Sequence, residues 1–222
     1  MNIKHADGWW WPAHEKHMLE WMANSKNRIM LNGRPAYQGK KQLAVLKHCK
    51  GRDGLYVDIG AHIGLWAYNM LPHFAFTHAF EPVAVHRACF ERNVLGHSSP
   101  EIVALHACAM GDAEGTCTIE TTNGSSGDSQ VRPGTEIPMR TLDSFNFDDV
   151  DLIKVDCEGF EEKALRGGVK TIKRCRPVIC VEQKRDMARR FGLEPQGAVR
   201  FLKELGYTVA EEIGGDYIMV PA

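Results

Sequence analysis

Four acidic residues of this chain lie at or near the ends of short apolar segments, where a carboxylate could bind a ligand or accept a proton. They are Asp58, Glu81, Asp156 and Glu182. If those segments are parallel strands of one sheet, their carboxyl ends meet at one edge, which is where ligands bind in open α/β sheets. We therefore expect the four acids to share one rim of the sheet.

The segment GLYVDIGAHIGLWAYNML at 54–71 places the first of these acids ahead of a glycine-containing loop. Its first part predicts a buried strand, and its second part predicts an amphipathic helix that Pro72 ends. Gly60 allows a sharp turn and a close approach to a ligand, because glycine has no Cβ atom. Gly64 allows the helix to pack closely on the strand. A strand, such a turn and a helix in this order predict a nucleotide-cofactor site.

The same loop distinguishes between two classes of cofactor. Glu81 could accept hydrogen bonds from both hydroxyls of an adenosine ribose, in NAD or in S-adenosylmethionine (SAM). The loop reads D-x-G-x-x-x-G, with His62 inside it, and lacks the G-x-G-x-x-G pattern that holds a pyrophosphate at a helix N-terminus. An acid beside the loop repels a pyrophosphate but suits the ammonium group of a methionine moiety. Methyl transfer from SAM is the favoured interpretation; an NAD(P)-dependent oxidoreductase and a non-catalytic SAM-binding protein are the alternatives.

The composition argues against several classes of protein. The 222 residues, 44% of them hydrophobic, carry a formal net charge of −1, so we expect neither a nucleic-acid binder nor a membrane binder. No apolar run approaches the length of a membrane span, and no cleavable signal pattern opens the chain. The seven cysteines are scattered without a C-x-x-C pair, which favours reduced core thiols, argues against zinc and predicts a cytoplasmic protein.

Strand and helix patterns alternate from residue 54 onward. Strands are predicted at 55–59, 76–82, 101–110, 150–159 and 177–182, with helices between them and a closing strand pair after residue 206. This alternation predicts an α/β fold, a mostly parallel sheet covered by helices on both faces. Residues 111–140, rich in Gly, Ser and Thr, predict an irregular hairpin insertion. The chain divides into an N-terminal helical cap or lid at 1–50 and a SAM-dependent methyltransferase domain at 51–222.

Five segments resemble the FkbM family of SAM-dependent methyltransferases: in this order, YVDIGAHIGLWA, AFEP, TLDSF, LIKVDCEGFEEKALRGG and RPVICVE. The resemblance covers roughly residues 35–183, and IKVDCEGFE is its specific part. It implies a Rossmann-like class I methyltransferase fold, with a seven-stranded sheet of order 3-2-1-4-5-7-6 and an antiparallel last strand. It also implies O-methylation of a hydroxyl on a sugar, a glycan or another small-molecule alcohol.

Two positions depart from the family pattern. His62 stands where the family commonly has Asn, and both side chains can form hydrogen bonds. The segment AYQ at 36–38 resembles an aromatic–acid pair of the family, with Tyr37 as the aromatic residue and Gln38 in place of the acid. A charge contact from position 38 is therefore not expected.

The cofactor-binding residues expected from the motifs and the resemblance are Tyr37, Asp58, Gly60, Ala61, His62, Gly64, Glu81 and Asp112. Asp112 follows the third strand and has two interpretations. In one it contacts the edge of the adenine, unless the backbone of Ala109 or Met110 makes that contact instead. In the other it forms a turn.

Three acids are candidates for the chemistry at the acceptor. Methyl transfer to an alcohol requires that the reactants are positioned in line and that the hydroxyl proton is removed. We expect Asp156 to accept this proton, with Glu158 and Glu182 holding or polarising the acceptor. Lys154, two residues earlier, could simply neutralise the acids.

A divalent cation at these acids is the less favoured alternative. Asp156 and Glu182 would end neighbouring strands about 4.8 Å apart, and their oxygen ligands suit Mg²⁺, Mn²⁺ or Ca²⁺. Such an ion would lower the pKa of a bound hydroxyl. Lys154 favours the site without a metal, because its ammonium group already offsets the negative charge.

The aromatic run WWWP at 9–12 has two interpretations, in both of which Pro12 opens a helix. In the first, the aromatic rings form a lid that stacks on a sugar-like substrate. In the second, which we favour, the helix packs over the sheet, because aromatic stripes usually belong to a core.

Overall fold

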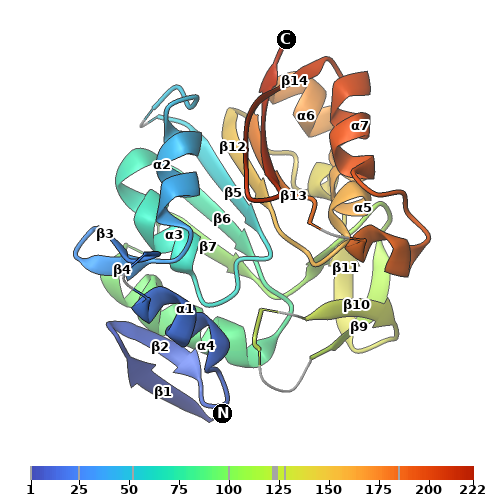
Figure 1. Cartoon of the computed structure of the whole chain (residues 1–222). Coiled ribbons are helices and arrows are strands. Elements are labelled where there is room, and N and C mark those ends of the chain that lie inside the picture. The colour runs from blue at the N-terminus through green and yellow to red at the C-terminus, as the bar shows by residue number, and fades with distance from the viewer. Residues whose placement is uncertain are drawn as a thin grey trace.

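The computed structural model describes residues 2–24, 26–51, 53–99, 101–121, 125–127, 129–184 and 186–222. A seven-stranded sheet lies at its centre, with helices on both faces (Figure 1). The strands of this sheet are β5 (Leu55–Ile59), β6 (Phe76–Phe80), β7 (Val103–His106), β12 (Val150–Val155), β13 (Val178–Glu182), β14 (Tyr207–Ile213) and β15 (Asp216–Pro221). The predicted α/β fold with a mostly parallel sheet is confirmed.

The strand order of this sheet is β7-β6-β5-β12-β13-β15-β14. Neighbours from β7 to β13 are parallel, and β15 is antiparallel to both β13 and β14. The labels differ from the expected 3-2-1-4-5-7-6, because β1 to β4 and β8 to β11 form small sheets of their own. Counted along the chain within the large sheet alone, its strands run 3-2-1-4-5-7-6 from the β7 edge.

Alternate side chains of the central strands enter two different cores. Val57 and Ile153 belong to a cluster with residues of α5 (Glu161–Arg166), α6 (Val169–Cys175) and α7 (Gly197–Glu204). Tyr56 and Leu152 belong to a second cluster with residues of α2 (Gly39–Leu46) and α3 (Leu65–Met70). Because both faces of the sheet are covered, these strands read as continuous apolar runs, as parallel strands do.

Three of the predicted strands end earlier than the sequence suggests. β6 stops at Phe80, since Pro82 has no N–H to continue a ladder. β12 stops at Val155, and Glu158 has φ of +54°, which an extended strand does not permit. The segment 101–110 divides into β7 and β8 (Ala109–Met110), and β8 pairs with β11 (Ile137–Arg140) instead of the central sheet.

Residues 111–140 contain the expected hairpin, formed by β9 (Gly115–Glu120) and β10 (Gln130–Pro133), but this hairpin is part of a small four-stranded sheet that was not expected. The strand order of this sheet is β10, β9, β11 and β8. The TCTIE segment of β9 contains β-branched residues that favour strands. The surrounding Gly and Ser residues obscured this pattern.

Strands also replace the helix that was expected to begin at Pro12. β1 (Ile3–Ala6) and β2 (Trp9–Pro12) form a hairpin, and α1 (His17–Ala23) begins later. A second hairpin of β3 (Ile29–Leu31) and β4 (Arg34–Ala36) precedes α2. Pro12 stands at the end of a strand, a position where its missing N–H is tolerated. The domain boundary at 50/51 stays a prediction. Within the described residues, no helix has the length and apolar character needed to cross a membrane.

Trp9 and Trp11 are fully buried and belong to the core, so the lid interpretation is wrong for both. They cluster with Met18 and Met22 of α1, Ile63 and Leu65 around the start of α3, and Cys89 of α4 (Ala84–Asn93). Trp10 donates its backbone N–H to Asn93 Oδ1 at 2.8 Å. Asn93 Nδ2 donates to the carbonyls of Trp10 and Ile63 at 3.0 and 2.9 Å. The first hairpin is thus fixed against α4.

Replacement of Gly64 by alanine tests the contact between α3 and α4. The Cβ atom would lie 2.4 Å from Val94 Cγ2 and 2.9 Å from Phe90 Cδ2, at a φ of +89°. We expect Gly64→Ala to lower the free energy of unfolding by about 2 kcal/mol or more, through overpacking and backbone strain together. Urea denaturation measures this loss.

Gly33→Ala is the matched control, because Gly33 has φ of +80° but no neighbouring atom within 4 Å of the added Cβ. It retains the backbone strain and omits the steric contact. Equal losses in the two variants would contradict a packing role for Gly64.

Candidate functional site

A cavity of about 190 Å³ opens at the carboxyl ends of β5, β6 and β12. Gly60, Glu81 and Asp156, which directly follow these three strands, line it, and so does Glu182 at the end of β13. The N-terminal segment contributes Met18 to the wall. The cavity therefore lies where parallel α/β sheets bind ligands.

Most of the predicted site residues line this cavity. They are Tyr37, Gly60, Ala61, His62, Glu81, Asp156, Glu158 and Glu182. Asp58, Gly64 and Asp112 do not, and the structure gives a different role to each of these three.

Asp58 is completely buried beneath the cavity and forms an ion pair with Lys154. The register of β5 and β12 sets the two residues side by side, and Asp58 Oδ1 lies 3.3 Å from Lys154 Nζ. Burial raises the pKa of Asp58, and the Lys154 ammonium opposes that rise. Strand alternation directs the Asp58 side chain toward the α2 and α3 face, so Asp58 does not line the cavity. Its contact with a methionine ammonium, expected directly or through water, stays a prediction.

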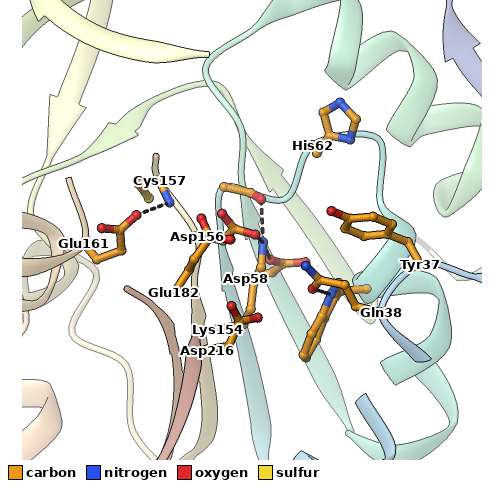
Figure 2. A network of polar contacts seen from close by, with 12 residues as sticks. Tyr37, Gln38, Asp58, His62, Lys154, Asp156, Cys157, Glu161, Glu182 and Asp216 are labelled. Atoms are coloured by element: carbon orange, nitrogen blue, oxygen red, sulfur yellow. Dashed lines mark hydrogen bonds and ion pairs between the residues drawn. The ribbon is translucent and has the colours of Figure 1, made fainter. Parts of the chain in front are cut away.

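Lys154 connects the glycine loop to the acids around it (Figure 2). Its Nζ donates to the Gly60 carbonyl at 2.7 Å and lies 3.9 Å from Asp156 Oδ2. A Cβ on Gly60, whose φ is +76°, would lie 2.0 Å from the Asp156 carbonyl oxygen. The close approach of the chain after β12 therefore requires glycine at position 60.

Gly64 and Asp112 lie away from the cavity. The closest neighbours of Gly64 are Phe90 and Val94, so its absent Cβ serves the packing of α3 near the end of α4 instead of a ligand contact. Asp112 is exposed, with its Oδ2 atom 3.8 Å from Lys163 Nζ. Ala109 and Met110 do line the cavity, which favours their backbone for the adenine contact.

Glu81 is buried and already organises the loop around it. Its carboxylate accepts backbone N–H bonds from His62 at 2.8 Å and Val83 at 2.8 Å, and His86 Nδ1 lies 3.3 Å away. Burial alone would raise the pKa of Glu81, but His86 and the two N–H donors outweigh it and lower the pKa. An ionised carboxylate that retains free lone pairs can accept further hydrogen bonds from a ligand.

Asp156, Glu158 and Glu182 form a compact acidic group, in which one carboxylate oxygen of each residue lies within 4.8 Å of one oxygen of each of the other two. Burial would raise the pKa of Asp156, but Lys154 and a hydrogen bond from Glu182 outweigh it, so this pKa is lowered. Burial and the charge of Asp156 raise the pKa of Glu182 to about 8. At neutral pH the pair therefore holds one proton, carried by Glu182, because two like charges at this distance cannot both ionise freely. Figure 2 shows the two carboxyl groups side by side.

Two further lysines balance the acids, and the sequence predicted neither of their ion pairs. Lys184 pairs with Glu182, and it lies 3.4 Å from Asp216 Oδ1. Lys41 of α2 pairs with Asp216, the first residue of β15. Residues from such distant parts of the chain carry no common sequence signal. Ammonium groups already stand beside these oxygens, so the donor set fits a cation site less well than the acids alone suggested.

The N-terminal segment and the insertion supply two residues that the sequence analysis also missed. Glu15 is buried and accepts a hydrogen bond from the backbone N–H of Ser126 at 2.6 Å. Ser126 Oγ lies 2.8 Å from His62 Nε2, at the wall of the cavity. Gln38, which lacks the family's charge, accepts the indole N–H of Trp66 at 3.1 Å.

The comparison with family models assigns the chain. Residues 58–209, more than half of its length, match the model described as the methyltransferase FkbM domain. The chain belongs to the FkbM methyltransferase family. The match spans the loop after β5, the insertion and the acids after β12, so the FkbM domain contains most of the residues around the cavity. No curated protein matches the chain in sequence.

Solved structures share the fold of this FkbM domain at low identity. Methyltransferase FkbM from Methylobacillus flagellatus KT is 17% identical with a TM-score of 0.51, over 75% of this chain and 43% of that one. Precorrin-6y C5,15-methyltransferase from Geobacter metallireducens GS-15 is 14% identical with a TM-score of 0.50, over 89% and 95% of the two chains. A protein of the NADB-Rossmann superfamily from Streptococcus agalactiae is 12% identical with a TM-score of 0.50, over 88% and 69%. The likeness shows a Rossmann-like fold.

Removal of Lys154 tests the ion pairs of the FkbM domain. Lys154→Met leaves Asp58 buried without its cation, so we expect the free energy of unfolding to fall by about 3–5 kcal/mol. The double variant Lys154→Met with Asp58→Asn removes the uncompensated charge and should recover part of this loss. Urea denaturation at neutral pH measures both, and a double variant with the summed losses of the two single variants would contradict the pairing.

Proposed function

We propose that this FkbM domain uses SAM to methylate a hydroxyl group of a small-molecule or glycan acceptor. The observation that carries the proposal is the single cavity on which Glu81, the Gly60 loop and the Asp156–Glu182 pair all open. In this cavity, Glu81 offers a carboxylate that can accept hydrogen bonds from ribose hydroxyls, and Asp156 offers a carboxylate that can accept a proton. The net charge of −1 supports a small or glycan acceptor over a nucleic acid or a membrane. A cytoplasmic location stays a proposal, supported by the seven free cysteines.

The residues of the cavity fit SAM better than NAD. Glu81 would accept the ribose hydroxyls, and the backbone of Ala109 or Met110 would meet the adenine edge. The loop from Gly60 to Gly64 has no G-x-G-x-x-G pattern for a pyrophosphate, and the nearby acids Asp156 and Glu158 would repel one. When bound, SAM supplies an electrophilic methyl group on its sulfonium.

Asp156 and Glu182 have different roles toward the acceptor hydroxyl. Asp156 is the ionised partner and can take the hydroxyl proton at a carboxylate oxygen. Its lowered pKa makes it a weak base, which suffices because the hydroxyl proton becomes strongly acidic as the oxygen gains a methyl group. Glu182 carries the shared proton and donates it to Asp156 in the free protein. When the acceptor binds, this hydrogen bond would pass from Asp156 to the acceptor oxygen and orient it, which leaves the Asp156 oxygen free to take the hydroxyl proton.

The charge of the pair favours an alcohol over other acceptors. Carboxylates beside an amine stabilise its protonated form, which has no lone pair for attack, and they repel an acceptor that is itself an anion. A neutral hydroxyl meets neither obstacle. Because Lys154, Lys184 and Lys41 already supply positive charge, the proposed chemistry requires no divalent cation.

Binding measurements test the cofactor. We expect S-adenosylhomocysteine to raise the melting temperature while NAD leaves it unchanged, because only a ligand that binds the folded state stabilises it. Glu81→Ala should weaken S-adenosylhomocysteine binding at least tenfold, since each hydrogen bond to a charged acceptor contributes about 1.5–3 kcal/mol. Isothermal calorimetry measures the affinity.

Glu91→Ala, on the exposed side of α4, is the control and should bind like the wild type. Circular dichroism checks that Glu81→Ala remains folded. Equal stabilisation by NAD would overturn the cofactor assignment. An unchanged S-adenosylhomocysteine affinity in a folded Glu81→Ala protein would overturn the ribose contact alone.

Turnover over a panel of sugars and small alcohols, with methyl-labelled SAM, tests the acceptor chemistry. We expect Asp156→Asn to lower the methylation rate about 10²- to 10⁴-fold, the usual contribution of a proton acceptor. S-adenosylhomocysteine affinity should change less than about threefold, because the substitution conserves shape. Exhaustive chelation should leave the wild-type rate unchanged.

Asp148→Asn is the matched control, since the Asp148 side chain is 86% exposed and far from this chemistry. A rate that disappears in the chelator and returns with Mg²⁺ or Mn²⁺ would assign the acids to a cation instead. Methylation of an amine with no alcohol as substrate would refute the O-methylation part alone.

A further inference from the structure

His62 lines the cavity with a ring whose two nitrogens differ in their surroundings. Its Nε2 atom lies 2.8 Å from Ser126 Oγ. Its Nδ1 atom is buried and has no hydrogen-bond partner among the described residues. The backbone of His62 is left-handed, with φ of +52°, and its N–H donates to the Glu81 carboxylate at 2.8 Å. Together these two features fix the position of the His62 Cα atom, from which the side chain extends.

The direction of the hydrogen bonds around Ser126 follows from Glu15. The Glu15 carboxylate accepts backbone N–H bonds from Met18 at 2.7 Å and from Ser126 at 2.6 Å, and it also contacts the Ser126 hydroxyl. Burial would raise the pKa of Glu15, but these donors outweigh it and lower the pKa, so the group is ionised. An ionised carboxylate has no proton to give. The Ser126 hydroxyl therefore donates to Glu15, and its oxygen is left to accept from His62.

This direction fixes the tautomer of His62. Since Ser126 Oγ accepts, Nε2 of His62 must carry the proton. Burial and the neighbouring His86 lower the pKa of His62, so the ring is neutral and Nδ1 carries no proton. Nδ1 is then a buried acceptor without a donor, an arrangement that costs about 1–3 kcal/mol until a partner arrives.

We propose that Nδ1 of His62 accepts a hydrogen bond from the bound cofactor, and that Glu15 and Ser126 are positioning residues that hold the ring in the tautomer able to accept it. The inference rests on the proposed function and names a contact to the same cofactor. SAM offers two kinds of donor near this loop, the ribose hydroxyls and the methionine ammonium group. The N-terminal segment and the insertion, which supply Glu15 and Ser126, then act on the cofactor through His62.

Nuclear magnetic resonance of histidine side chains in ¹⁵N-labelled protein tests the tautomer without any reaction. We expect the free protein to show His62 protonated at Nε2, assigned by comparison with His62→Asn. The Nδ1 resonance should move toward lower frequency when S-adenosylhomocysteine is added, as it does for a nitrogen that gains a hydrogen-bond donor. Ser126→Ala should allow the other tautomer to appear. A proton on Nδ1 in the free wild-type protein would overturn the proposal.

Two substitutions of His62 separate its two nitrogens in calorimetric titrations. His62→Asn can present an oxygen at the Nδ1 position and loses the bond to Ser126, whereas His62→Gln can reach Ser126 and has no acceptor at that position. We expect S-adenosylhomocysteine affinity to fall about tenfold or more in His62→Gln and less than about threefold in His62→Asn. Equal affinities of His62→Gln and the wild type would overturn the contact.

A second ligand identifies the donor. 5′-Methylthioadenosine keeps the ribose and lacks the ammonium group, so an equal His62→Gln penalty for this ligand assigns the contact to the ribose. Loss of the penalty assigns it to the ammonium group. Absence of S-adenosylhomocysteine binding to the wild type would overturn the proposed function together with this contact. Wild-type binding that His62→Gln retains in full would overturn the contact alone.

Discussion

The buried Lys154 ammonium is the interaction on which the site depends. It lies 3.3 Å from Asp58 and 3.9 Å from Asp156, and it binds the Gly60 carbonyl at 2.7 Å. One cation thus joins β5, the loop after it and the residues after β12 at the rim of the sheet. Its cost of desolvation is offset only because two carboxylates and a carbonyl surround it. Position 60 requires glycine, since any Cβ would meet the Asp156 carbonyl oxygen, and the Asp156 N–H bond to the Ile59 carbonyl at 3.1 Å holds this segment beside β5.

The same charge decides how the neighbouring acids ionise. Asp156 is close enough to Lys154 to stay ionised, and its charge then helps to raise the pKa of Glu182 to about 8. A low-dielectric rim amplifies both effects. The result is one ionised and one protonated carboxyl group side by side, and the proposed methyl transfer to an alcohol rests on this arrangement. Lys184 and Asp216 extend the balance to the end of β15.

Two segments outside the central sheet complete the cavity. The N-terminal segment and the insertion meet at Glu15 and Ser126, residues that are far apart in the chain. Glu15 is buried and ionised only because Ser126 and Met18 supply its donors, so each segment needs the other in place. The wall of the cavity at His62 is therefore a product of tertiary contacts.

The sequence by itself determined the strands of the central sheet to within a few residues, the glycine loop and the rim position of Glu81, Asp156 and Glu182, because apolar periodicity is a local property. From the sequence, Asp58 was expected to line the cofactor site. In the structure, strand alternation turns its side chain toward α2 and α3, where it pairs with Lys154. The sequence also placed the start of a helix at Pro12 and predicted no strand at residues 9–11, since an aromatic run does not show whether a residue such as Asn93 of α4 will hold it by hydrogen bonds. The roles of Lys41, Asp216, Glu15 and Ser126 were decided only by the tertiary structure. A charge or a hydroxyl shows its chemistry in the sequence, but its ionisation and hydrogen-bond direction depend on partners that only folding brings near.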